Sequence, residues 1–245
     1  MTAQLEQLSP SFRTDPEAAY AAYQELGYHV EYGVWTPEEC EALVRAARQF
    51  ESFREGRCAP LMNPHRQDPL FLTALRKPAV VRVMERLIGG PVSGLQTQFF
   101  FCQPGTRGFA RHQDNYFVEA KQEVFGSAWA ALQDVTPDMG GLVVYPRTHR
   151  EAILPVANVP DYQPTAHQCP NANREQAVLP PGYRGVDMAI PQGAVVFLHG
   201  HTVHSSHDNQ SDRFRHALLM TYIRRGEHFR PGKMAGRAEV DVYAP

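Results

Sequence analysis

The feature that most restricts the fold of this chain is a series of short strand-like segments in its second half. Turn-forming sequences rich in Pro, Gly and Asp separate these segments, as in residues 136–141. A chain with many short strands and turns is typical of an antiparallel sandwich or barrel. The predicted strands include Leu95–Phe101, Ala128–Asp134, Leu142–Tyr145, Ala194–Leu198 and Ala217–Ile223.

Helical patterns come before this region. Asp15 is a predicted N-cap and Gly27 a predicted helix end, and Thr36-Pro-Glu-Glu39 has the spacing of a capping box. We therefore predict an α+β, mainly β fold, in which N-terminal helices pack on a jelly-roll core (a double-stranded β-helix, cupin-like). The predicted helices are Asp15–Leu26, Thr36–Phe50, Leu70–Leu75 and Ala79–Ile88, with a strand at Tyr28–Val34.

The composition fits one globular domain over residues 1–245. A net charge of -2 argues against nucleic acid and anionic membranes as partners. Apolar runs are too short to span a bilayer, the N-terminus does not resemble a signal peptide, and four scattered cysteines indicate a reduced cytoplasmic protein. We expect residues 1–14 to be flexible. Residues 155–187 are polar and weakly periodic, and we interpret them as a candidate lid over an active site.

The chemistry centres on His112-x-Asp114. On a β-strand, residues i and i+2 point to the same face, so an imidazole and a carboxylate could occupy adjacent positions on one metal ion. A second histidine would complete the facial arrangement of non-haem Fe(II) oxygenases. The third ligand could be any of five histidines, of which we favour His204: His199, His201, His204, His207 and His216.

Arg215 supports this choice. It begins an apolar strand, so its charge is expected to be half-buried, and a buried arginine needs an anionic partner. A dicarboxylate that chelates a metal at one end would offer its other carboxylate to such a guanidinium. A structural salt bridge is the alternative explanation.

Four blocks of the sequence, in this order and spacing, resemble the phytanoyl-CoA dioxygenase (PhyH) family of Fe(II)/2-oxoglutarate-dependent oxygenases. The resemblance covers about residues 27–225. The blocks are His112-x-Asp114; Trp129-Ala-Ala-Leu-Gln-Asp-x-Thr136; Gly140-Gly-Leu-Val-Val-Tyr-Pro146-Arg-Thr-His149; and His204-Ser-Ser206-x-x-Asn209-x-Ser211-x-x-x-Arg215-x-Ala217.

The resemblance implies a role for several residues. His112, Asp114 and His204 match the iron ligands and therefore the catalytic centre. Arg215 matches the residue that binds the distal carboxylate of 2-oxoglutarate. The other residues expected to contact 2-oxoglutarate are Ser206, Trp129 and Gln98.

The sequence departs from the family pattern in two places, and both lie beside the expected ligands. Arg147-Thr148 replaces the usual Gly-Ser of a Pro-Gly-Ser-His block, and Ser205 follows the distal histidine where glycine is frequent. Halogenating relatives lack the metal-binding carboxylate, so Asp114 favours hydroxylation. We expect a small-molecule substrate, with candidate contacts at Asn115, Tyr116, Arg111, Arg147 and His149.

The implied activity uses Fe(II), 2-oxoglutarate and O2, converts 2-oxoglutarate to succinate and CO2, and oxidises a substrate C–H bond. Two alternatives remain from the residues alone. A cupin-like protein could bind a metal and a ligand without redox turnover, and a zinc hydrolase could use the same ligands. The oligomeric state is expected to be a monomer or a homodimer.

Overall fold

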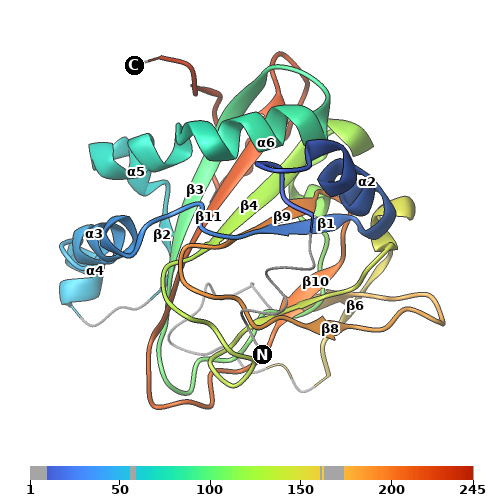
Figure 1. The fold of residues 1–245 in the computed structure, drawn as a ribbon. Helices are drawn as coiled ribbons and strands as arrows, with labels where there is room; N and C mark the ends of the chain where they lie inside the picture. Colours follow the sequence, from blue (N-terminus) through green and yellow to red (C-terminus); the bar gives the residue numbers. More distant parts are fainter. Residues whose placement is uncertain (1–9, 56–58, 161, 163–173, 245) are drawn as a thin grey trace.

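The computed structural model describes residues 10–55, 59–160, 162 and 174–244. Two antiparallel sheets face each other, and helices cover the outer face of the larger one (Figure 1). The described part of the chain holds no helix with the length and hydropathy of a membrane span.

The larger sheet has seven strands, all paired antiparallel. The long strand β11 lies at its centre, between β3 and β4. In spatial order the strands are β1 (Tyr28–Glu31), β9 (Val195–His199), β4 (Phe125–Ala131), β11 (Arg215–Arg224), β3 (Val92–Cys102) and β12 (Val240–Asp241), with β2 (Leu61–Met62) also paired to β3.

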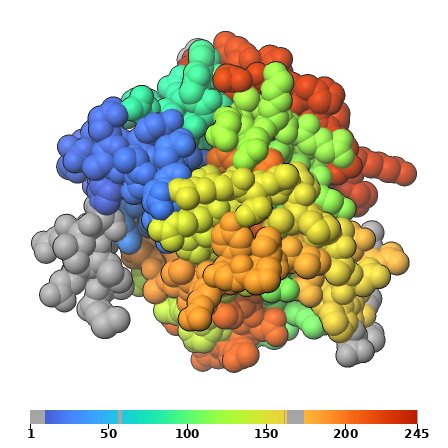
Figure 2. All heavy atoms as spheres, turned by 90° about the vertical axis from the view of Figure 1, so that its right-hand side faces the viewer, coloured from blue at the N-terminus to red at the C-terminus, as the bar shows by residue number. Residues whose placement is uncertain are grey.

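The smaller sheet consists of β10 (His204–Ser206), β5 (Leu142–Val144) and β8 (Val186–Asp187). A separate hairpin joins β6 (Val156–Asn158) to β7 (Glu175–Ala177). In Figure 1 β10, β8 and β6 lie below the larger sheet, on the side opposite α6. Figure 2 shows the yellow-to-orange part of the chain spread across one face beside the blue N-terminal helices.

Most helices precede β3 in the chain, as predicted. Helix α6 buries more residues than α2 or α3, among them Val80, Met84 and Leu87, which pack against the sheet. The helices are α2 (Pro16–Leu26), α3 (Pro37–Ala47), α4 (Glu51–Arg54), α5 (Pro69–Leu75), α6 (Pro78–Ile88) and α7 (Asn115–Val118), with 3-10 turns at Pro64–Arg66, Gln122–Val124 and Thr148–Arg150.

Local signals in the sequence explain the helix ends. The Asp15 side chain accepts from Ala18 N, and Thr36 and Glu39 form the predicted capping box. Gly27 ends α2 in the left-handed region with φ +80°. The helix predicted to run to Phe50 ends instead at Ala47, and a separate short helix, α4, follows.

Strand alternation divides the side chains of the larger sheet between two environments. Phe99, Leu218 and Tyr222 pack toward the helices in the main core. Their neighbours point to the inner side, where two rows of side chains cross the sheet. Register places Gln98, Leu219 and Trp129 in one row, and Gln96, Thr221 and Ser127 in the next. These rows form one wall of the site.

Residues 1–14 and 155–187 are the two segments expected to be mobile. Residues 10–14 are held in place, because the buried Glu31 carboxylate accepts from Phe12 N at 2.9 Å and from the Ser11 hydroxyl. Residues 1–9 lie outside the described residues. The candidate lid at 155–187 contains the short strands β6, β7 and β8, which its weakly periodic sequence does not indicate. Its residues 161 and 163–173 also lie outside the described residues.

Candidate metal centre and cavity

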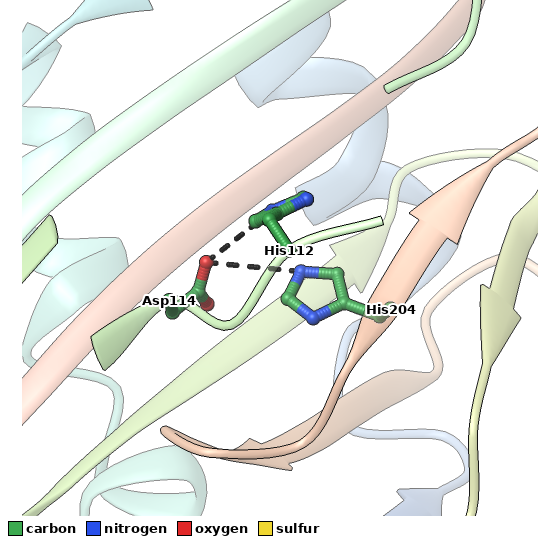
Figure 3. A group of neighbouring side chains, drawn as sticks. All are labelled: His112, Asp114 and His204. Carbon is green, nitrogen blue, oxygen red and sulfur yellow. Dashed lines mark ion pairs between the residues drawn. The ribbon is translucent and has the colours of Figure 1, made fainter. Parts of the chain in front are cut away.

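The structure brings His112, Asp114 and His204 together, and one donor atom of each lies within 4.8 Å of the others. Asp114 Oδ1 is 3.6 Å from His112 Nε2 and 3.7 Å from His204 Nε2 (Figure 3). In Figure 3 His204 extends from its strand toward Asp114, and His112 approaches the same carboxylate from the neighbouring loop. Two imidazoles and one carboxylate therefore converge on a single point.

Hydrogen bonds leave the converging atoms free to bind a metal. His112 Nδ1 lies 2.7 Å from Ala110 O, and His204 Nδ1 lies 3.1 Å from Thr202 O. Each Nδ1 must donate to its carbonyl, so in the neutral form of each imidazole Nε2 carries the lone pair. The Ser127 hydroxyl donates to Asp114 Oδ2, which orients Oδ1 toward the histidines.

The three side chains perturb one another's protonation. Burial lowers the pKa of His204 to about 4, and repulsion from His112 adds to the shift. Burial would raise the pKa of Asp114, but attraction to His204 and hydrogen bonds from His112 and Ser127 hold it well below its usual range. Burial disfavours the charged form of His112, yet bonding and attraction to Asp114 outweigh this and raise its pKa. At neutral pH the site therefore offers the Asp114 carboxylate and the neutral His204 imidazole, and a metal would displace the Nε2 proton that Asp114 stabilises on His112.

The backbone differs from the strand expected at 112–114. His112 pairs with His204 in an isolated antiparallel bridge, with N···O distances of 2.9 and 3.0 Å. Asp114 already has helical angles, φ -59° and ψ -35°, because α7 begins immediately after it. The prediction that both side chains share one face of a strand is therefore wrong. A turn, fixed by the Ser127 bond, brings the carboxylate beside His112.

A cavity of about 270 Å³ extends from this cluster across the inner side of the larger sheet. Phe109, Phe117 and Phe125 form part of its apolar wall, and Met234 stands at its exposed edge. Ligand sites are typically concave and apolar with a few placed polar groups. This cavity has that character, and the three converging side chains lie on its wall.

Arg215, the first residue of β11, reaches the same cavity and is 3% exposed. Its guanidinium carbon lies 5.7 Å from the Trp129 ring centroid and 6.0 Å from that of Phe100. The buried Nε has no hydrogen-bond partner, and no carboxylate of the described residues forms an ion pair with Arg215. A buried cation without a counter-ion is costly, so the site is suited to an anionic ligand.

Comparison with known proteins agrees with this geometry. The family model described as phytanoyl-CoA dioxygenase (PhyH) matches residues 23–217. The chain belongs to the PhyH family. A Caenorhabditis elegans protein named "Probable phytanoyl-CoA dioxygenase" is 26% identical over 198 residues, which cover 77% of this chain and 62% of that protein. An Arabidopsis thaliana "Phytanoyl-CoA dioxygenase" is 31% identical over 130 residues, or 53% of this chain and 44% of that protein. This PhyH-family chain thus spans about half of the length of such curated relatives.

Solved structures resemble the whole described fold. One is the epimerase SnoN in complex with Fe3+, alpha ketoglutarate and a nogalamycin compound, with a TM-score of 0.72 and 20% identity over 89% of this chain and 88% of SnoN. Another is EvdO2 from Micromonospora carbonacea var. aurantiaca complexed with 2-oxoglutarate, with a TM-score of 0.72 and 16% identity over 95% of this chain and 96% of EvdO2. The predicted jelly-roll fold is confirmed.

The structure places all three further residues expected at 2-oxoglutarate on the cavity wall of this PhyH-family chain. Trp129 and Gln98 belong to the same cross-sheet row, and Gln98 Nε2 lies 3.3 Å from Met62 Sδ. Ser206 Oγ accepts from Phe109 N at 2.8 Å, which leaves its own proton available for a ligand. These placements fit the expected roles.

The residues suggested as substrate contacts separate into two groups. Asn115 is 1% exposed and binds Ala120 and His201, so it supports the loop. Arg147 pairs with Glu25, and His149 contacts Gln24 O; neither lines the main cavity. The structure does not bring these three to the metal cluster.

Tyr116 and Arg111 are placed differently. They line a smaller neighbouring pocket that shares His112 and Phe117 with the main cavity. Arg111 also donates to the side chain of Gln176 on β7, at 3.0 Å. Substrate contact by these two residues stays a prediction.

Several residues that line the cavity are not among those predicted from the sequence. Gln96 and Ser127 lie two positions before Gln98 and Trp129 on their strands, so alternation alone could have identified them. Thr221 lies an even number of positions after Arg215 on β11, so the same alternation places it on the cavity side. Arg237 lies beyond the part of the chain that resembles the family, and no pattern in the sequence indicates it.

Proposed function

We propose that this protein is an Fe(II)- and 2-oxoglutarate-dependent dioxygenase that oxidises, most simply hydroxylates, a C–H bond of a small organic substrate. The observation that carries the proposal is the buried, unpaired Arg215 in the same cavity as two histidines and a carboxylate. A non-redox metal protein or a zinc hydrolase has no need for a carboxylate anchor at this position. No described feature favours either alternative.

The residues present fit the implied metal and cosubstrate. His112, Asp114 and His204 would hold Fe(II) on one side, a ligand set typical of iron oxygenases with open positions. Arg215 would bind the distal carboxylate of 2-oxoglutarate as a bidentate partner, and the Ser206 hydroxyl would donate to it. When bound, iron and 2-oxoglutarate supply oxidation by O2, with release of succinate and CO2.

The protein's own share is positioning and protection from water. The bonds that the histidines donate to Ala110 O and Thr202 O, and the bond that Asp114 accepts from Ser127, orient the three ligands before a metal binds, so little reorganisation accompanies binding. Phe109, Phe117 and Phe125 enclose the cavity with apolar surface. The cytoplasmic location and the monomer or homodimer state also remain proposals.

Substitution of Arg215 tests the proposed anchor. An anaerobic titration of the Fe(II) protein with 2-oxoglutarate should show at least a tenfold weaker affinity in Arg215→Ala, because the charge-assisted bidentate bond is lost. Iron affinity should remain within about twofold of wild type, since Arg215 contacts none of the ligands. Arg213→Ala, which removes a neighbouring exposed arginine, is the matched control. Unchanged 2-oxoglutarate affinity in Arg215→Ala would contradict the proposal.

A further inference from the structure

The cavity has a second polar end, distinct from the Arg215 end. On β11, Arg215 and Thr221 point to the same inner side and are six residues apart, which corresponds to roughly 20 Å along a strand. Thr221 lies opposite Gln96 on β3 and opposite Ser127 on β4. Ser127 in turn holds Asp114, so the row of these residues runs directly beside the metal cluster.

Arg237 also belongs to this second polar end of the cavity. The loop that carries it joins the larger sheet beside Gln96, because Ala238 N reaches Leu95 O at 3.5 Å and β12 then pairs with β3. Asn63 Nδ2 holds the same loop by donating to Ala235 O at 2.7 Å. The loop therefore covers the cavity, and the Arg237 side chain lines it.

Three donors at this end lack partners. Arg237 Nε, Gln96 Nε2 and Thr221 Oγ1 are each buried and have no hydrogen-bond partner among the described residues. Arg237 Nη1 donates to Phe117 O at 3.0 Å and to Arg230 O at 3.3 Å, so this nitrogen is occupied. The side of the guanidinium formed by Nε and Nη2 remains, and it has the geometry of a bidentate carboxylate fork.

No described carboxylate neutralises Arg237. Asp114 is near enough to favour its charged form, but no ion pair forms between them, and Asp114 is directed to the histidines and Ser127. Burial and the neighbouring Arg230 act against the charge and lower the pKa of Arg237. A half-buried guanidinium with a buried, unpartnered Nε, beside two further unsatisfied donors, has the composition of an oxyanion site.

We propose that Arg237, with Gln96 and Thr221, binds the carboxylate of the substrate, which is a small carboxylic acid with an apolar body. This inference rests on the proposed function and names the substrate class of that same site. The row from Gln96 to Ser127 crosses three neighbouring strands, about 10 Å in all. The oxidised carbon should therefore lie within about 10 Å of the carboxylate, beside the phenylalanines of the cavity wall.

Matched acids and amides test the proposal on the Fe(II) protein saturated with 2-oxoglutarate, without O2. The probes are 3-phenylpropanoate and hexanoate, each compared with its primary amide, and binding is measured by calorimetry. Saturating 2-oxoglutarate occupies the Arg215 end, so a probe acid cannot bind there. We expect the wild type to bind each acid at least tenfold more tightly than its amide.

Substitutions of Arg237 test whether its guanidinium causes the preference for acids over amides. Arg237→Gln should abolish the acid preference, and Arg237→Lys should retain part of it, because lysine keeps the charge but not the fork. Arg230→Gln is the matched control: Arg230 also bonds to Tyr116 and Phe117 carbonyls, but it does not line the cavity. Arg230→Gln should keep the full acid preference, which separates recognition from simple loosening of the loop.

Three results would overturn the proposal: equal binding of acids and amides by the wild type, no binding of any probe, or an acid preference that survives in Arg237→Gln. Succinate formation by the same wild-type preparation reports separately on the proposed function. Succinate without acid preference overturns the substrate class alone, whereas absence of both succinate and 2-oxoglutarate binding overturns the activity itself.

Discussion

Four buried polar atoms that have no hydrogen-bond partner among the described residues line one cavity. They are Arg215 Nε at one end, and Gln96 Nε2, Thr221 Oγ1 and Arg237 Nε at the other. Each unsatisfied buried group costs on the order of 1–3 kcal/mol. Such a set is best explained by ligands that satisfy it, one at each end of the cavity.

Ser127 shows how a residue that touches no ligand can set metal affinity. Its hydroxyl donates to Asp114 Oδ2 and so directs Oδ1 toward the histidines. We predict that Ser127→Ala weakens Fe(II) binding about tenfold, the lower end of the range for such supporting bonds. Competition with a chromogenic chelator measures this affinity.

Ser93→Ala is the control for Ser127→Ala. Ser93 is also buried on the larger sheet, and its hydroxyl bonds to Glu239 rather than to a ligand. Its substitution should leave iron affinity within twofold of wild type. Equal weakening in the two variants would show that Asp114 does not depend on Ser127.

For single residues, the sequence indicates the types of metal ligand but not how they are arranged in space. The spacing of His112 and Asp114 suggested two ligands on a strand, whereas the carboxylate comes from a helical turn fixed by a distant strand. Local spacing cannot reveal a contact made across the fold. Arg237 shows the same limit, since its role depends on where the final loop docks.

At the scale of elements, the junction between α2 and β1 joins the N-terminal helix to the sheet near the site. Gly27 has φ +80°, and a Cβ there would lie 2.3 Å from His149 Nδ1 and 2.6 Å from Thr202 Oγ1. Glycine is needed here for conformation and for space. The backbone of Gly27 also accepts from the Thr202 hydroxyl, next to the segment that leads to His204.

Gly89 provides a matched comparison for Gly27. It ends α6 with φ +76°, but a Cβ there would meet nothing within 4 Å. We predict that Gly89→Ala lowers the free energy of unfolding by about 1–2 kcal/mol, the cost of the left-handed conformation alone. Gly27→Ala should cost clearly more because the clash is added. Equal losses in chemical denaturation would contradict this.

Elements with strong local signals were predictable, and weakly patterned ones were not. Capping residues and Gly27 indicated α2 and α3, and alternation indicated β3 and β11. The hairpin of β6 and β7 has strands of three residues each that are mostly exposed, too short for a hydrophobic period to mark them. Its strands are specified by pairing with each other rather than by burial.

At the scale of the whole molecule, buried histidines link stability to pH. Burial lowers the pKa of His65, His204 and His216 to about 4 each. In the unfolded chain these groups bind protons near pH 6.5. Between pH 6.5 and 4 the unfolded state therefore binds more protons, and the free energy of unfolding falls as the pH falls. The raised pKa of His112 acts in the opposite direction, but as one group against three.

His216→Phe tests this linkage away from the metal. His216 stacks on Phe214 with ring centroids 5.8 Å apart, so a phenyl ring suits the position. We predict that the metal-free variant loses less stability than the metal-free wild type between pH 7 and 5, because one proton-linked group is gone. Urea denaturation at both pH values measures the difference. Identical losses of stability in the two proteins would show that His216 does not contribute to the pH dependence.

Succinate formation from 2-oxoglutarate tests the metal centre and the proposed activity together. It is measured for wild type and His112→Ala, with Fe(II) and O2 but no added substrate. We predict slow, iron-dependent succinate formation in the wild type and its loss in His112→Ala, since the variant lacks one of the three ligands. Succinate at equal rates in both proteins would contradict the assigned metal centre. Failure of the wild-type Fe(II) protein both to form succinate and to bind 2-oxoglutarate anaerobically would contradict the proposed activity.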